Sequence, residues 1–584
     1  MRPSWPEDTS FRRLDLDVED SHCQRCCAPL HICDHRFHRF YTFDGPTELV
    51  CRLAHCSDPS CPLRSKTLSP QAELTLTLPR WILGWDVFCW IGQRRFARHW
   101  SVPQIQTELQ QTYHIPLSQD ALRNYLRRYQ IMVAARQQDP RQLASAYRSI
   151  KSLILTIDGL QPEKGHETLY VVRELNGKRV WFAQALLSSS TDEIRALLIQ
   201  ARQWAEQLDL PVKLWISDKQ DAFVKGIAQE FAGVPHRYCQ NHFVRDLAKD
   251  TLEKDSHAKV QLRKHVRGLR AIEREVLEQR RRQEDPQELC QQEVKPTSKS
   301  AAPVAVAEPA PEDPSAKKSM SAGPDRVVKA MPGSLAPGTA REDRKDQIVL
   351  DYCAVVRGIL TDNRGGPLHP AGLRMAEALV EVQESLQRNL ALNRPGPAHG
   401  QLERLSRCIE KGLDQVEKEQ QEVRAEVEEI AKVAATLDEK TGTRKERRAR
   451  FKQLQRTYQK QGGSFFGRLG RVMLSFMVGL FVGPRAKQAE ENRLRDNLEL
   501  ERWFRQPKGH ARRIHGRAHA GTRIVEEGST LVLVLDAHRS HPEVFASQEL
   551  QEYRDAQAPE HEREALQRRK LMRKGRSKKK KGPL

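Results

Sequence analysis

The chain has 584 residues, of which 38% are hydrophobic and 30% are charged. This length exceeds what one hydrophobic core supports, so the sequence predicts two to four domains. The formal net charge of +21 and the pI of about 9.5 disfavour an acidic or neutral partner and favour a polyanion, with nucleic acid as the first candidate. A basic surface without a specific ligand is the alternative that charge alone leaves open.

The first 85 residues hold a cluster of cysteines. Seven of the twelve cysteines lie between Cys23 and Cys61, and nothing at the N-terminus resembles a signal peptide, so we expect a reducing cytosol and a metal site instead of disulfides. Cys23 and Cys26 have the two-residue spacing of a zinc knuckle. Cys56 and Cys61 are the preferred second pair because Ser-Asp-Pro-Ser between them suits a turn, with Cys51 as the substitute. We therefore predict a zinc-ribbon-like domain over residues 1–85, against the alternative of reduced cysteines without metal.

Residues 86–148 are predicted to hold a helix-turn-helix. Apolar residues at helical spacing occur between 102 and 109 and again between 121 and 126, and a turn-like segment separates them. The second helix would present polar side chains able to reach base edges and phosphates. These candidates are Ser118, Gln119, Arg123, Asn124 and Arg127. The alternative is a helix pair that binds nothing.

From residue 149 to 284 the period changes to that of strands. SLILTID, LYVVREL and RVWFAQALL read as three strands, with Asn176-Gly177 as a hairpin turn. A helix from Thr191 to Leu208, the strand VKLWIS, a helix over 221–231, a short strand over 237–239 and a helix from near Asn241 follow. Three antiparallel strands, then helix, strand, helix and strand, is the order of an α/β ribonuclease H-like fold with a mixed five-stranded sheet and flanking helices.

The remaining chain divides by composition. Residues 285–345 are rich in Pro, Ala, Ser, Glu and Lys and predict a disordered linker. Residues 346–490 predict an all-helical insertion, in which Leu402 to Leu437 reads as a charged helical hairpin. The apolar run from 465 to 482 contains two arginines and predicts a buried helix instead of a membrane span. Residues 491–540 would return to the core, and 541–584 would form a basic tail, disordered from Arg568.

Two aspartates follow the first and fourth predicted strands. Asp158 follows ILTI and Asp218 follows LWIS, 60 positions later (218 − 158). Because these strands are neighbours in a ribonuclease H-like sheet, the two carboxylates would lie side by side, which is costly unless a cation neutralises them. Mg²⁺ or Mn²⁺ suits such oxygen ligands. The alternative is that both residues merely end strands.

The stretches LTIDGLQPEKGHETLYVVREL and WISDKQDAFVKGIAQEFAGVPHRYCQNHFVRDLAKD resemble the core of the Mutator-like and related bacterial insertion-sequence transposases. Cys239 and His242 match the family's Cys-x-x-His motif. Alone they fit a half-buried Cys and a capping His; the resemblance favours a role in ordering the site or a bound DNA end. In DNLELERWFRQPKGHARRIHGRAHAG, Glu501 takes the position of the family's catalytic Glu, with Glu499 as the local rival. Of the usual Thr-Asn-Asn lead only Asn497 is present.

The resemblance implies a DDE-type transposase in which Asp158, Asp218 and Glu501 hold a pair of Mg²⁺ or Mn²⁺ ions, cleave DNA and join 3′-hydroxyl ends to target DNA. It implies double-stranded DNA as partner, both the terminal inverted repeats and the target. No membrane is expected, a homodimer is open, and the place of action would be the bacterial cytoplasm at the nucleoid. Basic residues beyond Glu501 could hold DNA phosphates, or form an exposed basic helix face. These are Lys508, Arg512, Arg513 and Arg517.

Three alternatives compete with the transposase. A catalytically decayed or domesticated copy would keep the DNA-binding end and lose strand transfer, and the altered lead into Glu501 keeps this hypothesis open. A metal-dependent nuclease without strand transfer is the second. A glycosidase that uses the aspartate pair is remote, because nothing else resembles a sugar cleft.

Overall fold

The structure is a computed structural model that describes Trp5 and residues 8–161, 167–284, 341–392, 396–483, 498–516 and 520–579. At 282–284, 341–345, 498 and 572–579 it describes the backbone alone. Residues 285–340 of the expected linker at 285–345 lie outside the described residues, as do Asn497 and Arg517. The chain divides into two compact units, one of Met1–His242 with Phe476–Leu584 and one of Phe243–Ser475. Within the described part of the chain, no helix is both long and apolar enough to span a bilayer.

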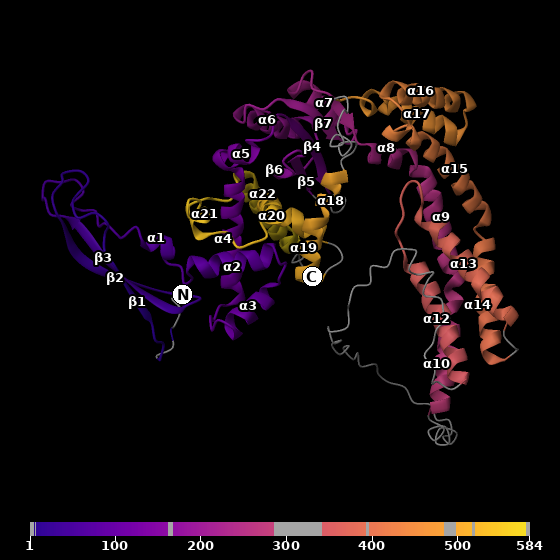
Figure 1. Cartoon of the computed structure of the whole chain (residues 1–584), viewed down its shortest axis with the longest axis horizontal. Coiled ribbons are helices and arrows are strands. Elements are labelled where there is room, and N and C mark those ends of the chain that lie inside the picture. The colour runs from indigo at the N-terminus through magenta and orange to yellow at the C-terminus, as the bar shows by residue number, and fades with distance from the viewer. Residues whose placement is uncertain are drawn as a thin grey trace. The chain divides into compact units, whose positions relative to one another are not determined.

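The first unit begins with a three-stranded sheet that includes a long hairpin (Figure 1). Strand β3 (Gly45–Cys56) pairs in parallel with β1 (Arg12–Leu16) and antiparallel with β2 (Leu30–Thr42). Gly45, the first residue of β3 after the turn, has a φ of 115°, which favours glycine. Because Leu30 pairs with Cys56, the segments that precede β2 and follow β3 meet at one end of the hairpin.

A group of helices follows this sheet. They are α1 (Glu73–Leu76), α2 (Trp85–Phe96), α3 (Val102–Gln111), α4 (Gln119–Gln138) and α5 (Pro140–Tyr147). The two helices expected between 102 and 130 correspond to α3 and α4, and α4 continues eight residues further (138 − 130). The hydroxyls of Ser101 and Ser118 cap them by accepting backbone N–H groups. The apolar stripes of both helices are buried in one core.

The centre of this unit is a five-stranded mixed sheet in the order β6-β5-β4-β7-β8. Its strands are β4 (Leu153–Leu160), β5 (Thr168–Glu174), β6 (Arg179–Leu186), β7 (Val212–Ser217) and β8 (His236–Tyr238). β4, β5 and β6 are antiparallel neighbours, whereas β4, β7 and β8 are parallel. The predicted mixed sheet with flanking helices is confirmed, and its first and fourth strands are neighbours as expected.

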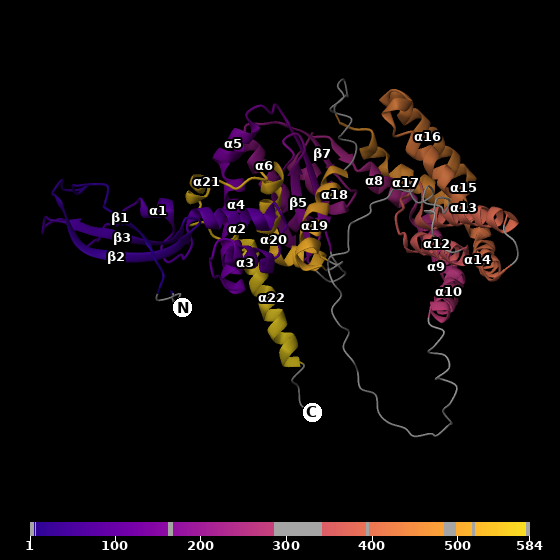
Figure 2. The same ribbon diagram turned by 60° about the horizontal axis from the view of Figure 1, so that its bottom comes forward.

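Helices cover both faces of this sheet. On one face, α6 (Thr191–Gln207) and α7 (Asp221–Glu230) share a core with alternate residues of the strands, among them Leu155, Ile157 and Trp215. On the other face, α20 (Gly521–Ser540) packs against β5 and β6 (Figures 1 and 2). Helix α6 begins at Thr191 as expected and is capped by the Ser190 hydroxyl.

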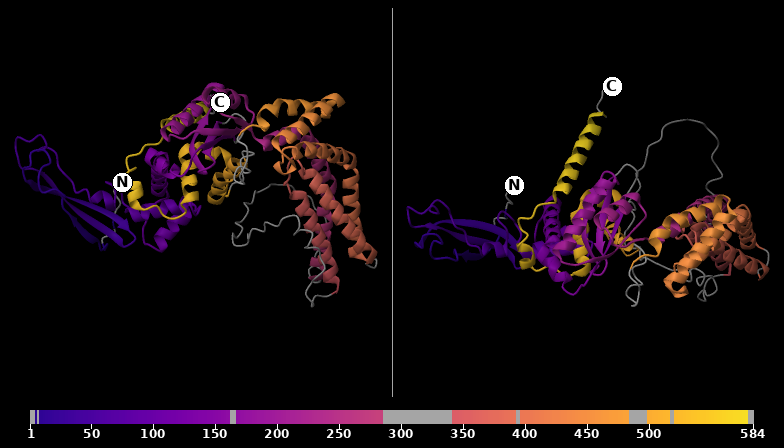
Figure 3. Two further views of the ribbon diagram at one scale, coloured as in Figure 1. Left: turned by 45° about the horizontal axis from the view of Figure 1, so that its top comes forward. Right: turned by 90° about the horizontal axis from the view of Figure 1, so that it is seen from above.

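The C-terminal part of the first unit is also helical. Before and after α20 lie α18 (Leu498–Trp503), α19 (Arg505–His515), α21 (Ser547–Gln551) and α22 (Glu560–Lys579). The prediction that the tail is disordered from Arg568 is wrong up to Lys579, because α22 extends that far. This helix projects from the body of the unit (Figures 2 and 3). Glu562 and Arg569 anchor the helix by pairing with Arg127 and Glu167.

The described part of the second unit is built of helices. They are α8 (Gln240–Leu247), which begins in the first unit, α9 (Lys249–His265), α10 (Leu269–Glu284), α12 (Arg341–Thr361), α13 (Ala371–Leu392), α14 (Pro397–Asp414), α15 (Glu417–Ala435), α16 (Arg444–Gln461) and α17 (Ser464–Leu480), which ends in the first unit. Short 3-10 turns lie at Val266–Gly268 and Glu439–Thr441. The expected charged hairpin corresponds to α14 and α15. The predicted burial of helix α17 holds for one face only, since Leu469 and Met473 are buried whereas Leu474 and Val478 are 53% and 74% exposed.

Candidate functional site

Four cysteines converge at the free end of the β2–β3 hairpin. The ligand atoms of Cys23, Cys26, Cys56 and Cys61 all lie within 4.8 Å of one another. The Sγ atoms of Cys23 and Cys61 are 3.8 Å apart, and those of Cys26 and Cys56 are 3.3 Å apart. Tetrahedral zinc with Zn–S bonds of about 2.3 Å needs sulfur atoms separated by about 3.8 Å. The four thiols therefore fit a structural zinc site, and the predicted choice of Cys56 and Cys61 is confirmed.

The backbone around Cys23 already favours its thiolate. N–H groups of Cys26 and Arg25 point at the Cys23 sulfur and lower the pKa of this thiol to about 7. The backbone N–H of Cys27 donates to the carbonyl of Cys23, and Cys27 itself has a φ of 57°, which closes the tight turn of a knuckle. Cys51 lies elsewhere, buried with Phe40 and Leu49. The substitute ligand is therefore not part of the cluster.

The second candidate site lies at the carboxyl ends of three parallel strands. Ile154 pairs with Leu214 and Thr156 with Ile216, an offset of 60 residues (214 − 154) that puts Asp158 level with Asp218. Ser217 pairs with Tyr238, an offset of 21 residues (238 − 217), and the N–H of the next residue, Cys239, donates to the carbonyl of Ser217. Asp158, Asp218 and Cys239 thus form one row across β4, β7 and β8. The prediction that Asp158 follows its strand is wrong, because β4 continues two residues further (160 − 158) through its pairing with β5. Ligand sites are common at this edge of α/β sheets.

The side chain of Asp158 points to the face of the sheet that α18 covers. Asp158 pairs with Val171 on β5, and directly paired residues share a face. Val171 belongs to the same buried core as Leu500 of α18, and α18 packs against β4. The Asp158 carboxylate accepts the N–H of Gly159, and the Asp218 carboxylate accepts the N–H of Gln220. Both side chains are partly exposed.

Glu501 lies on α18 and is held in place by a buried ionic network. Two residues further, the Trp503 indole N–H donates to Asp536 of α20 at 2.8 Å. Asp536 also accepts from the Arg173 guanidinium at 2.9 Å and from the backbone N–H of Val180 at 2.8 Å. Arg173 is fully buried and Asp536 is 6% exposed. This network joins β5, β6, α18 and α20, so the position of Glu501 depends on the core of the sheet.

The carboxylate of Glu501 contacts the start of α8. Asn241 donates its amide to both carboxylate oxygens, at 3.2 and 3.0 Å, and Nδ1 of His242 is 3.7 Å from Oε1. The ligand atoms of Cys239, His242 and Glu501 all lie within 4.8 Å of one another. Among the described residues, the groups of three or more possible ligands with atoms this close are this triad and the four thiols. Asp158, Asp218 and the rival Glu499 belong to neither group.

The candidate DNA-reading residues of α4 do not share one environment. Ser118, Arg123 and Asn124 are exposed and Gln119 is half-buried. Arg123 pairs with Asp120 on the same helix. Arg127 is engaged inside the unit, where it donates to Thr530 at 2.8 Å and pairs with Glu562 at 3.3 Å. Of the basic candidates beyond Glu501, Arg512 and Arg513 are exposed on α19 and Lys508 is half-buried.

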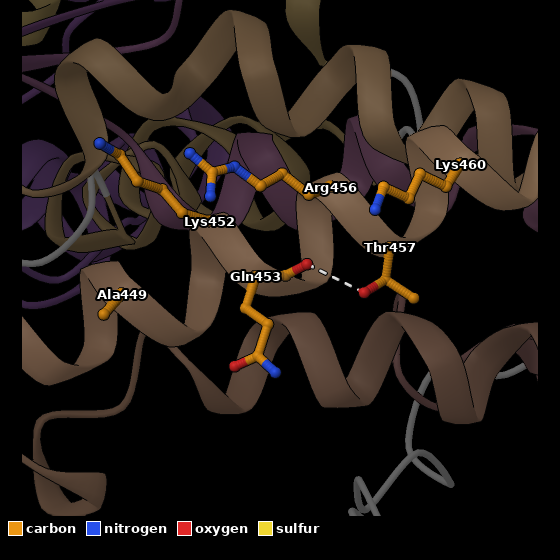
Figure 4. Close-up of a pocket in the computed structure, with 6 residues that line it drawn as sticks. All are labelled: Ala449, Lys452, Gln453, Arg456, Thr457 and Lys460. Carbon is orange, nitrogen blue, oxygen red and sulfur yellow. Dashed lines mark hydrogen bonds between the residues drawn. The ribbon is translucent and has the colours of Figure 1, made fainter.

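The second unit presents a basic face that the sequence-based predictions missed. Helix α16 carries eight Lys or Arg residues and one acid. Lys452, Arg456 and Lys460 recur every four residues and, with Ala449, Gln453 and Thr457, line an open hollow of about 420 Å³ (Figure 4). Phe451 and Tyr458 are buried on the other side of the helix. The four-residue spacing of basic side chains between 452 and 460 is a signal that could have indicated this face from the sequence.

Comparison with known families and proteins gives no assignment. Neither a scan against protein-family models nor a search of curated proteins finds a match to this chain.

Proposed function

We propose that this protein is a transposase with a ribonuclease H-like catalytic core. It would bind the terminal inverted repeats of a mobile element, cleave the DNA beside them and join the resulting 3′-hydroxyl ends to target DNA. The observation that carries the proposal is the register of the central sheet, which puts Asp158 and Asp218 level on parallel neighbouring strands. The strand order, with three antiparallel strands followed by two parallel ones, supports the same fold.

The donors at this edge fit Mg²⁺ or Mn²⁺. Asp158 and Asp218 offer carboxylate oxygens, which these hard cations prefer, and the partly exposed position leaves room for water and phosphate oxygens. A bound pair of such ions supplies Lewis-acid activation of the water or 3′-hydroxyl that attacks the scissile phosphate. The role of the two aspartates would be to fix the ions at this edge of the sheet; neither has to transfer a proton.

Glu501 is the third proposed ligand. In a two-cation site the ions are about 4 Å apart, so the outer ligands are not within reach of a single ion. Asp158, Asp218 and Glu501 do not form one compact ligand group among the described residues, so the proposal requires ligands shared between two ions. To hold a cation, the Glu501 carboxylate would have to give up its hydrogen bonds from Asn241, while the Trp503–Asp536 bond would keep α18 on the sheet.

Double-stranded DNA is the proposed partner. Its phosphates would contact the exposed arginines of α19 and the basic face of α16, where Lys452, Arg456 and Lys460 stand in one row (Figure 4). The exposed Arg123 and Asn124 of α4 are the proposed base-reading side chains. Arg127 is better assigned to anchoring α22 through Glu562.

A second function is supported by one observation. The Glu501 carboxylate is occupied by Asn241 and faces His242. If that arrangement persists on DNA, the protein is a catalytically decayed transposase that acts as a sequence-specific DNA-binding protein. The two functions differ in whether DNA is cut, not in whether it is bound.

The test is cleavage of labelled duplex DNA taken from the flanks of the gene, in Mn²⁺, by wild type, Asp158→Asn and Asp218→Asn. Loss of a cation ligand removes several kcal/mol of charge stabilisation, so we expect cleavage to fall at least about 1,000-fold. Asp192→Asn, an exposed aspartate in the first turn of α6, is the matched control and should cleave like wild type.

Equal cleavage by Asp158→Asn and wild type would overturn the proposed mechanism. DNA binding without cleavage by any variant, wild type included, would favour the DNA-binding function instead.

A further inference from the structure

Cys239, His242 and Glu501 come from three different elements and place their ligand atoms together. Cys239 follows β8, His242 lies in the first turn of α8, and Glu501 lies on α18. The three ligand atoms are within 4.8 Å of one another, and the Nδ1 atom of His242 is 3.7 Å from Oε1 of Glu501. Ligands bound at about 2.0–2.3 Å to a tetrahedral ion are separated by roughly 3.3–3.8 Å. The measured His–Glu separation lies in this range.

The environment of His242 indicates an ion instead of a direct hydrogen bond. Its Nδ1 atom has almost no exposure to solvent and no hydrogen-bond partner among the described residues. The 3.7 Å separation from Glu501 is too long for a hydrogen bond. A buried ring nitrogen without a partner is costly, and coordination of a cation would satisfy it.

Hydrogen bonds already hold Glu501 and Cys239 in position. Asn241 donates to both oxygens of Glu501 and orients the carboxylate. Cys239 is fully buried and its backbone N–H is bonded to Ser217, which fixes the residue at the end of β8. Hydrogen bonds that orient the ligands are typical of metal sites.

The donor set decides which cation fits. A sulfur, an imidazole nitrogen and a carboxylate oxygen do not suit Mg²⁺, which prefers oxygen alone, but they suit Zn²⁺ and similar transition ions. Three protein ligands leave a fourth position of a tetrahedral ion open. We propose that Cys239, His242 and Glu501 form a binding site for one such ion, separate from the four-thiol cluster near the N-terminus.

This site does not require the proposed transposase activity, because ion binding is measured without DNA. If the transposase activity is also present, the transition ion and the Mg²⁺ or Mn²⁺ pair compete for Glu501. Substitution of His242 should then remove the binding of the transition ion, whereas substitution of Asp158 should remove DNA cleavage.

The test is the zinc content of the purified full-length chain after dialysis against metal-free buffer, measured by inductively coupled plasma mass spectrometry. Wild type should retain about two zinc ions per chain, and His242→Gln and Cys239→Ser about one each, since each variant loses one of only three ligands. His257→Gln is the control, because His257 lies on a helix with Nδ1 3.4 Å from Glu419 but belongs to no group of three close ligands among the described residues. It should retain about two ions.

Retention of wild-type zinc content by His242→Gln would overturn the proposal. X-ray absorption at the zinc edge of the wild type needs no variant and guards against misfolding. A shell of nitrogen or oxygen at about 2.0–2.1 Å beside the sulfur shell at about 2.3 Å is expected. A pure sulfur shell would leave only the N-terminal cluster occupied and would contradict the site.

Discussion

The four thiols near the N-terminus and the acids at the edge of the central sheet are both proposed as cation ligands in the first unit, but the chain assembles them differently. The thiols come from two short segments that a single hairpin joins, with Leu30 paired to Cys56. Asp158, Asp218 and Glu501 lie on β4, beyond β7 and on α18, and depend on the register of a whole sheet and on a buried network around Asp536. The first group is local, whereas the second needs the complete fold of the unit.

The largest expected effect concerns the four thiols near the N-terminus. Cys56→Ser should remove about one zinc ion per chain and make the segment around residues 20–65 sensitive to protease, because a structural zinc site of this kind supplies the stability of a small domain. Zinc analysis and limited proteolysis measure the two effects.

Cys51→Ser is the matched control for Cys56→Ser, since Cys51 is equally buried but lies with Phe40 and Leu49 away from the cluster. It should keep the zinc. If Cys51→Ser loses the ion and Cys56→Ser keeps it, the four-thiol cluster is not the zinc site.

The next effect concerns the buried network around Asp536 that supports α18 and Glu501. Asp536→Asn leaves the fully buried Arg173 guanidinium without its charged partner, so the free energy of unfolding of the first unit should fall by about 3–5 kcal/mol. Urea denaturation followed by tryptophan fluorescence measures it, with Trp503 itself bonded to Asp536.

Asp120→Asn provides the contrast, because the Asp120–Arg123 pair is exposed. Its loss should cost at most about 0.5 kcal/mol. Equal destabilisation by the two substitutions would mean that the Asp536 network does not support α18 in the way described.

Acid should weaken the same core. Burial lowers the pKa of His538 from 6.5 to about 4, and its ring contacts the Tyr129 hydroxyl at 2.9 Å. The unfolded chain then binds the proton more readily than the folded one, so the stabilisation is present above pH 6.5 and is lost as the pH falls towards 4. Between pH 7 and 5 the free energy of unfolding should fall by about 2 kcal/mol from this residue.

Chemical denaturation of wild type and His538→Gln at the two pH values measures this loss. The variant should show a shallower pH dependence, while His31→Gln, an exposed histidine on β2, should follow wild type. Identical slopes for wild type and His538→Gln would exclude His538 as the source.

The smallest effect concerns the second unit. Lys452→Ala, Arg456→Ala and Lys460→Ala should each weaken DNA binding modestly and lower the slope of log affinity against log salt by about 0.9 for each phosphate that the variant no longer neutralises. Lys418→Ala is the control, because Lys418 is exposed on α15 between two glutamates. Fluorescence anisotropy across a salt series measures the slope, and an equal change in the control would remove α16 from the proposed interface.

Features that a short stretch of chain determines could be predicted from the sequence. Strands such as SLILTID are short, apolar and β-branched, so their number and order in the central sheet could be predicted. The position of Asp218 directly after β7 was predicted correctly, whereas Asp158 lies within β4. The spacing of Cys23 and Cys26 predicted the knuckle in the same local way.

Interactions between distant segments could not be predicted from local pattern. The pairing of Asp536 with Arg173 joins residues 363 positions apart, and no periodicity indicates it. The helix that replaces the expected disordered tail depends on Glu562 and Arg569 finding Arg127 and Glu167. The triad of Cys239, His242 and Glu501 likewise needs α18 to lie beside the start of α8.

The proposed cation site at the edge of the central sheet is tested most directly by anomalous diffraction at the manganese edge, from crystals of the chain bound to nicked DNA in Mn²⁺. We expect anomalous density at about 2.0–2.3 Å from carboxylate oxygens of both Asp158 and Asp218. Density confined to other sites, with none between these two carboxylates, would contradict the proposed catalytic core.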